Sequence, residues 1–235
     1  MEIEDGADVR WVAALSGRDE RAAHSALLEA GSDRRLFSHI ARLHRVERRP
    51  DYGEIVAPLE LYALVRLMRP QHVVEVGVSS GVSSAYLLRA LEANRYGTLH
   101  SVDLPKPPRR TADGSVSVRS SWSLPPGRSS GWAVPFVLRP RWDLRLGNKS
   151  IVLPLLASEL PRVDLFVYDV PHDDADARRE FRELEPLIPD GGVAIADHGP
   201  GGGCCAALAA VARSWKAPAV GRRGSGLYGA RRAAR

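Results

Sequence analysis

Residues 73 to 83, Val-Val-Glu-Val-Gly-Val-Ser-Ser-Gly-Val-Ser, constrain the fold of this chain more than any other segment. The valines around Glu75 predict a buried β-strand that ends in an acid, and the two glycines predict a tight turn that opens a helix. A strand, a glycine turn and a helix in this order are typical of the doubly wound α/β folds. In such folds, ligands bind at the carboxyl ends of the strands.

The positions of the glycines indicate which cofactor this turn accepts. A dinucleotide fingerprint, G-x-G-x-x-G, needs its middle glycine so that the backbone can approach the pyrophosphate. Ser79 occupies that position here, and Gly81 comes late. S-Adenosylmethionine has no phosphate; its cationic amine and sulfonium beside a carboxylate suit a strand-end acid together with helix-start amides. The loop therefore favours S-adenosylmethionine, with Glu75, Gly77, Ser79, Gly81 and Ser83 as predicted cofactor-binding residues.

A second acid follows at a spacing typical of the same unit. The run Thr-Leu-His-Ser-Val-Asp predicts a strand that ends in Asp103, 26 residues after Gly77. The corresponding acid of a Rossmann unit lies roughly 20 residues beyond its glycine loop. Asp103 is therefore predicted to accept hydrogen bonds from both ribose hydroxyls of the cofactor.

The rest of the chain alternates predicted strands and helices. A helix from Leu59 to Met68 should end at Arg69-Pro70, because proline stops it before the first strand. Alternation of strand and helix then continues as far as residue 197, which predicts a mainly parallel sheet. Near the end of the chain, Gly224-Ser225-Gly226 predicts the turn of a closing hairpin.

Taken together, these motifs resemble the class I S-adenosylmethionine-dependent methyltransferases, notably the catechol-type and related small-molecule O-methyltransferases. Residues 163 to 169 and 189 to 198 look like that family's fourth strand and its helix, turn and fifth strand. The resemblance covers roughly residues 55 to 235. It implies a Rossmann-like, doubly wound, mainly parallel seven-stranded sheet with an antiparallel last strand. It also implies methyl transfer to a small-molecule acceptor, with oxygen favoured as the acceptor atom.

Three predicted site residues follow the fourth and fifth strands. Asp169, Asp197 and His198 should converge beside the transferred methyl group. Catechol-type enzymes hold a divalent ion with an Asp after the fourth strand and an Asp-Asn pair after the fifth, and this chain looks similar at Asp169 and Asp197. His198 replaces the Asn, which shifts the preference from Mg²⁺ toward Mn²⁺, Fe²⁺, Co²⁺ or Zn²⁺. The alternative is a metal-free site in which the Asp-His pair hydrogen-bonds or acts as acid and base.

Two further roles come from the same resemblance. His172 stands three residues beyond Asp169, the offset at which catechol-type enzymes place a catalytic lysine. With an ordinary pKa of about 6.5 it can take the acceptor's proton, as Asp169 or His198 can; otherwise it is a solvated residue at a helix start. Asn148 follows the third strand, where the family commonly contacts the adenine. Asp169 is also a predicted cofactor contact.

Two segments are predicted additions to the methyltransferase domain of residues 55–235. Residues 1–54 should form a helical cap of two amphipathic helices separated near residues 31–33, which covers the acceptor, makes a homodimer contact or merely packs. Residues 105–135 are dense in Pro, Ser, Arg and Gly and carry Trp122 and Trp132. A connection of this length predicts a lid insertion over cofactor or acceptor, with a disordered insert as the alternative.

The charge distribution argues against a nucleic-acid partner. The formal net charge is +5, yet 30 of the 33 basic residues are arginine, a skew that genomic composition explains more simply than phosphate binding. The arginine clusters are not interleaved with aromatic stacking platforms. The alternatives that stay open are an RNA or protein methyltransferase that uses these clusters, and a non-catalytic adenosylmethionine-binding protein.

Location in the cell is predicted from composition. No stretch approaches the roughly 20 apolar residues of a membrane span, and the acidic start Met-Glu-Ile-Glu-Asp is unlike a secretory signal. The two cysteines, Cys204 and Cys205, are adjacent, so they imply no disulfide framework. We therefore expect a cytoplasmic protein without a membrane partner.

Overall fold

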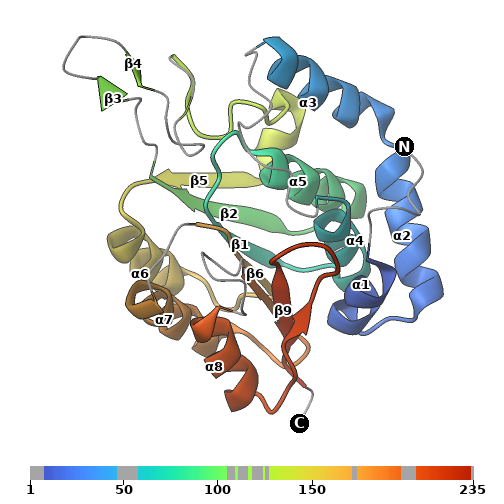
Figure 1. Ribbon diagram of the computed structural model, residues 1–235, viewed down its shortest axis with the longest axis vertical. Coiled ribbons are helices and arrows are strands. Elements are labelled where there is room, and N and C mark those ends of the chain that lie inside the picture. Colours follow the sequence, from blue (N-terminus) through green and yellow to red (C-terminus); the bar gives the residue numbers. More distant parts are fainter. Residues whose placement is uncertain are drawn as a thin grey trace.

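A computed structural model describes residues 8–46, 58–104, 109–110, 116–117, 124, 127–170, 174–196 and 205–233. Figure 1 shows a central twisted sheet with helices on both faces. Its seven strands lie in the order β5-β2-β1-β6-β7-β9-β8. Their bounds are His72–Val76 (β1), Thr98–Asp103 (β2), Trp142–Leu146 (β5), Leu165–Tyr168 (β6), Val193–Ala196 (β7), Val220–Gly221 (β8) and Tyr228–Arg231 (β9).

Strand directions confirm the predicted Rossmann-like sheet. Strands β1, β2, β5, β6 and β7 pair in parallel, and the last strand, β9, runs antiparallel to both β7 and β8. The turn at Gly224 joins β8 to β9, as the glycines predicted. Two short strands, β3 (Arg109–Arg110) and β4 (Val116–Ser117), form a separate antiparallel pair.

The helices begin where capping residues and turns allow. The described residues 8–46 form three helices instead of the two that were predicted, because Asp8 caps an additional helix by accepting a hydrogen bond from the Trp11 amide at 3.0 Å. The predicted break near residue 33 is present, and Asp33 caps the helix that follows it. The bounds are Val9–Ser16 (α1), Glu20–Ser32 (α2), Arg34–Val46 (α3), Pro58–Met68 (α4), Val82–Asn94 (α5), Lys149–Glu159 (α6), Asp174–Leu184 (α7) and Ala206–Ser214 (α8), with short 3₁₀ helices at Phe136–Arg141 (η2) and Glu185–Leu187 (η3).

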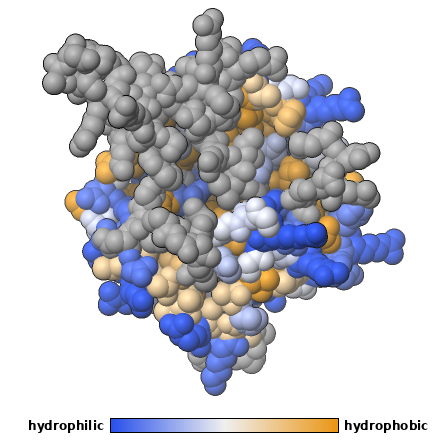
Figure 2. All heavy atoms as spheres, in the orientation of Figure 1, coloured by the Kyte–Doolittle hydropathy of each residue, from blue (hydrophilic) through white to orange (hydrophobic). Residues whose placement is uncertain are grey.

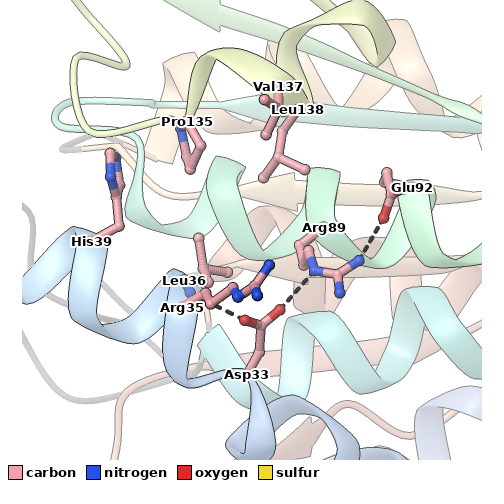
Figure 3. A pocket seen from close by; sticks show the side chains of 9 residues that line it. All are labelled: Asp33, Arg35, Leu36, His39, Arg89, Glu92, Pro135, Val137 and Leu138. Atoms are coloured by element: carbon pink, nitrogen blue, oxygen red, sulfur yellow. Dashed lines mark hydrogen bonds and ion pairs between the residues drawn. The ribbon is translucent and has the colours of Figure 1, made fainter.

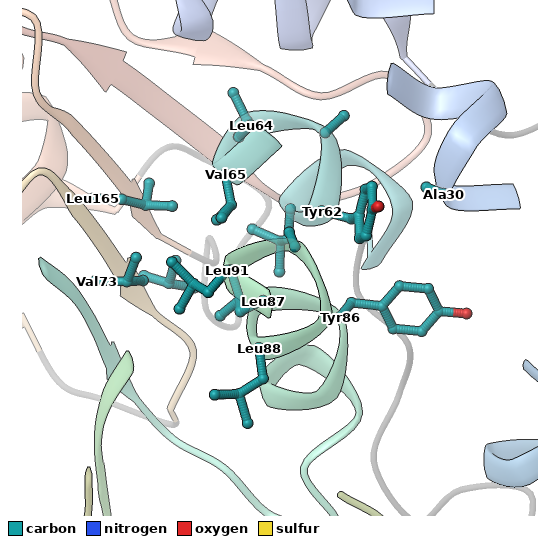
Figure 4. Close-up of a cluster of buried hydrophobic side chains, with 14 of the residues drawn as sticks. Ala30, Tyr62, Leu64, Val65, Val73, Tyr86, Leu87, Leu88, Leu91 and Leu165 are labelled. Atoms are coloured by element: carbon teal, nitrogen blue, oxygen red, sulfur yellow. The ribbon is translucent and has the colours of Figure 1, made fainter. Parts of the chain in front are cut away.

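Each face of the sheet has its own apolar core. Because side chains alternate along a strand, Val73 faces α4 and α5 whereas Val74 faces α6, α7 and α8. Figure 4 shows the first core, in which Val65 of α4 and Leu91 of α5 lie beside Leu165 and Val73 of the sheet. The buried residues of α1 and α2 belong to this same core, so these helices pack on the same side of the sheet as α4 and α5.

The first helix is tied to the C-terminal hairpin by polar contacts. The Trp11 indole donates to the Val220 carbonyl at 2.9 Å, and the Arg222 guanidinium donates to the buried Glu60 carboxylate at 2.6 Å. Asp8 accepts from the amide of Arg223 at 2.8 Å. Segments more than 200 residues apart in the chain therefore lie side by side.

Hydrophilic residues lie mainly along the left, right and lower edges of the face shown in Figure 2. They are drawn in blue, and orange and pale apolar residues lie between them. Within the described residues, no helix has the length and hydropathy that crossing a membrane requires.

Candidate cofactor site

The predicted glycine turn joins β1 to α5 at the carboxyl edge of the sheet. Gly77 has φ +98°, and a Cβ atom there would lie 2.0 Å from the backbone oxygen of Asp169. Gly81 has φ +87°, and a Cβ atom there would lie 2.7 Å from the Cα atom of Gly131. Because both positions need a positive φ and leave no room for a side chain, glycine is required at each. The loop is thus enclosed between the end of β6 and residue 131.

Glu75 lies directly beneath this loop and has no exposed surface. Its carboxylate accepts hydrogen bonds from the hydroxyls of Ser83, Ser84 and Ser101 at 2.7, 2.6 and 2.7 Å. Burial raises the pKa of Glu75 to about 7, helped by the nearby charge of Asp169 and opposed by the three hydroxyls. The enclosed carboxylate therefore fixes the start of α5 to the sheet and places a titratable acid under the loop.

Asp103 ends β2 and is only half-buried. Its Oδ1 accepts a long hydrogen bond from the Val78 amide at 3.4 Å, and its Oδ2 accepts a short one from the hydroxyl of Ser130. The backbone oxygen of Asp103 accepts from Gly147 at 2.9 Å, which brings the exposed Asn148 beside it in the chain. The Asn148 side chain caps α6 by accepting from the Ser150 amide at 3.0 Å.

Asp169 follows β6 and lies next to the glycine turn. Its amide donates to the Val76 carbonyl at 2.9 Å, so the residue after β6 adjoins Gly77. In the parallel pair β6–β7, Tyr168 is the partner of Ala196, and residues 169 and 197 therefore follow paired strand ends. Asp197, His198 and His172 lie outside the described residues. Among the residues that are described, no group of three His, Cys, Asp or Glu side chains is placed to hold a metal ion.

A buried polar cluster that the sequence did not reveal supports this edge. Lys149 Nζ donates to Tyr168 Oη at 3.0 Å and to Glu180 Oε2 at 2.7 Å, and Tyr168 Oη donates to the same Glu180 oxygen at 2.6 Å. Burial and the Glu180 carboxylate raise the pKa of Tyr168 well above its ordinary value, which keeps the phenol protonated as a donor. The cluster joins α6 and α7 to the end of β6, immediately before Asp169.

A groove of about 450 Å³ lies beyond the glycine loop, between α3, α5 and η2. Figure 3 shows Leu36, Pro135 and Leu138 facing one another across it, with His39 at one end and Arg89 toward the other. Arg89 is bound to Asp33 at 2.6 Å and to Glu92. One wall of the groove is α3, the last of the N-terminal helices.

Comparison with protein families identifies the class. Residues 74–198 match the model of a methyltransferase domain family, which is more than half of the chain. The chain therefore belongs to this methyltransferase family, and the predicted family is confirmed. The search of curated proteins gave no match.

Solved structures agree on the fold. The O-methyltransferase TomG from Streptomyces achromogenes, involved in tomaymycin synthesis and solved in complex with SAM, is 21% identical, with a TM-score of 0.54 and full coverage of both chains. An O-methyltransferase from Bacillus cereus in complex with SAH is 17% identical, with a TM-score of 0.52, covering 83% of this chain and 90% of that one. A methyltransferase from Geobacter sulfurreducens is 16% identical, with a TM-score of 0.51, covering 86% and 90%.

Proposed function

We propose that this protein transfers a methyl group from S-adenosylmethionine to an oxygen atom of a small-molecule acceptor. The observation that carries the proposal is the convergence of Gly77, Asp103 and Asp169 at one sheet edge in a chain of the methyltransferase family. The O-methyltransferases from S. achromogenes and B. cereus hold SAM and SAH in the same fold, which supports the choice of cofactor and of oxygen.

In the proposed complex, the half-buried Asp103 accepts hydrogen bonds from the two ribose hydroxyls of the cofactor. Asn148 lies near the adenine. The amino acid part of the cofactor binds to the loop at residues 77–81 and to Asp169. The buried Glu75 acts from below, since its oxygens already accept from three serine hydroxyls. It holds Ser83 at the loop and adds negative potential under the cofactor's two cationic groups.

The transfer itself needs an aligned acceptor and a place for its proton. As the acceptor oxygen bonds to the methyl carbon, the bond from that carbon to the sulfonium sulfur breaks, and the hydroxyl proton leaves to a base. His172 and His198 are the proposed bases, because they follow the ends of β6 and β7 at this edge by four and two residues in the chain. The groove beside His39 and Pro135 is the proposed approach for the acceptor.

A divalent ion at Asp169, Asp197 and His198 is a second part of the proposal. The pairing of Tyr168 with Ala196 supports it, because the residues that follow these two strand ends start from adjacent positions. A bound cation would lower the pKa of the acceptor hydroxyl as a Lewis acid. Without the ion, the same residues would act as simple hydrogen-bonding and basic groups.

Two arginines near the C-terminus, Arg222 and Arg232, do not favour the alternative of an RNA or protein acceptor. Arg222 is bound to the buried Glu60, and Arg232 donates to the Ile188 carbonyl at 2.7 Å. Both side chains are mostly buried, at 14% and 24% exposure. Guanidinium groups held in this way contribute to packing more than to a phosphate-binding surface.

Calorimetric titration with S-adenosylmethionine, S-adenosylhomocysteine and a nicotinamide dinucleotide tests the cofactor. We expect micromolar-range binding of the first two only; preference for the dinucleotide would overturn the proposal. Methyl transfer to a panel of phenols and aliphatic alcohols, with and without chelator and metal add-back, then tests the acceptor and the ion. Full activity in chelator would remove the ion from the proposal and leave a histidine as base.

A further inference from the structure

Ser130 lies within the predicted lid, yet its hydroxyl is 27 residues along the chain from the carboxylate that it contacts. We propose that Ser130 is a positioning residue for the cofactor's ribose, because it holds the Asp103 carboxylate in the orientation that accepts both ribose hydroxyls. This assignment rests on the proposed function, in which Asp103 binds the ribose. It adds a residue from outside the strand ends to the cofactor site.

The position of Ser130 is fixed by the backbone around it. Residues 129–134, here termed the strap, run along the glycine loop: the Gly131 amide donates to the Ser79 carbonyl at 2.8 Å, and the Ala133 amide donates to the Ser80 carbonyl at 2.9 Å. Ser130 stands next to the first of these bonds and is only 4% exposed. The backbone hydrogen bonds of the strap thus fix the position of the Ser130 hydroxyl beside Asp103.

The two hydrogen bonds to Asp103 explain why its orientation matters. One oxygen accepts from the Val78 amide and the other from Ser130, so the rotation of the carboxylate is set from both sides. Each carboxylate oxygen can accept a second hydrogen bond. A ribose presents two neighbouring hydroxyl donors, and a carboxylate held in this plane can accept one on each oxygen.

A second chain of contacts connects the strap to the buried Glu75. Gly131 has φ +71°, and a Cβ atom there would lie 2.0 Å from the Trp142 ring. The Trp142 indole donates to Ser101 Oγ at 2.9 Å, and Ser101 donates to Glu75 at 2.7 Å. The strap is therefore packed against the supports of both strand-end acids, which makes it part of the cofactor site.

The test compares Ser130→Ala with Ser129→Ala, a matched control whose side chain is exposed on the same strap. Calorimetry measures binding of S-adenosylhomocysteine and of its analogue lacking both ribose hydroxyls. We expect Ser130→Ala to weaken binding of the normal ligand by roughly 10-fold or more, the lower end of what a lost hydrogen bond to a charged group costs. Binding of the analogue should be unchanged, Ser129→Ala should leave both ligands unchanged, and Ser130→Thr should restore affinity.

Equal weakening of both ligands by Ser130→Ala would show a general packing role and overturn the assignment. Tighter binding of the normal ligand would also overturn it, because Ser130 would then compete with the ribose. Failure of the unaltered protein to bind either ligand would overturn the proposed function itself, an outcome distinct from the other two. If Ser130→Ala lowers the melting temperature sharply, Ser130→Cys provides the same comparison with a weak donor of similar size.

Discussion

Glu75 and Asp103 lie near the carboxyl ends of the neighbouring strands β1 and β2, but the structure places them in opposite environments. Glu75 is completely buried and accepts from three hydroxyls, whereas Asp103 is half-exposed and accepts from one amide and one hydroxyl. The cause is strand register: Glu75 is paired with Ser101, two residues before the end of β2, and Asp103 is the terminal residue. A shift of two residues along parallel strands therefore places Glu75 in the interior and Asp103 at the exposed carboxyl edge of the sheet. They are termed here the inner acid and the rim acid.

This comparison assigns different work to the two carboxylates. The inner acid sets the position of the loop through Ser83 and Ser84 and contributes a charge that depends on pH. The rim acid is open to a ligand and is oriented by Ser130. Changes at the interior should therefore appear mainly in folding stability, and changes at the rim should appear mainly in ligand affinity.

The largest expected effect is on the loop that separates the two acids. Gly77→Ala should destabilise the protein by about 4 kcal/mol or more, because its Cβ atom would lie 2.0 Å from the backbone oxygen of Asp169 at a positive φ. Urea denaturation measures the change. Gly127→Ala is the matched control: its φ is +77°, but among the described residues no atom beyond its chain neighbours lies within 4 Å of the added methyl, and we expect a cost of only about 1 kcal/mol. Similar costs at both positions would refute the steric explanation.

The next effect is the dependence of folding stability on pH that Glu75 causes. Because the pKa of Glu75 is raised to about 7 from its ordinary 4.5, the folded state binds this proton more tightly than the unfolded state. Stability from Glu75 is thus complete below pH 4.5 and is lost as the pH rises toward and through 7. Relative to Glu75→Gln, the natural protein should lose on the order of 2 to 3 kcal/mol of unfolding free energy between pH 4.5 and 8.

The comparison with Glu75→Gln removes the other titrating groups from this measurement. Burial and His100 lower the pKa of His72, which acts in the opposite direction, since that stabilisation is lost as the pH falls. His72 is present in both proteins, so its contribution cancels in the difference. A difference between the two proteins that does not vary with pH would mean that Glu75 is ionised throughout.

The rim acid should show the reverse pattern. Asp103→Ala should weaken binding of S-adenosylmethionine by about 1 to 3 kcal/mol, because two hydroxyls of the cofactor lose their acceptor. Its effect on unfolding should be smaller than that of changing the fully buried Glu75, since Asp103 is only half-buried. Calorimetry and thermal melting of the same samples separate the two quantities. A large loss of stability with unchanged affinity would place Asp103 among the interior supports and remove it from the ribose.

The sequence predicted the strand ends and not the contacts between them. Apolar runs and the glycine turn located Glu75, Gly77 and Asp103, because each belongs to a local pattern of strand, turn and helix. Ser130 carries no such pattern: it lies in a segment rich in Ser, Pro and Gly, and only the pairing of the strap with the glycine loop brings it to Asp103.

The same reason explains the cluster of Lys149, Tyr168 and Glu180, whose members come from α6, β6 and α7. The local sequence around each of these residues predicts only an ordinary helix or strand. Their contact depends on how the two helices cover the sheet. The additional helix α1 was missed for a different reason. Its eight residues are short for a periodic pattern, and its cap at Asp8 is shared with the distant Arg223 amide.

Asn148 is expected to show the smallest effect, and its two roles can be separated by substitution. Its side chain caps α6, and it follows β5 at the rim, where the adenine is proposed to lie. Asn148→Ala should cost about 1 kcal/mol of stability, and Asn148→Ser should recover most of that cost because serine also caps helices. If Asn148 also contacts the adenine, the serine variant should regain stability but not affinity for S-adenosylhomocysteine in calorimetry. Recovery of both would mean that Asn148 acts only through the helix cap, and the rim contact would then be limited to Asp103 and its strap.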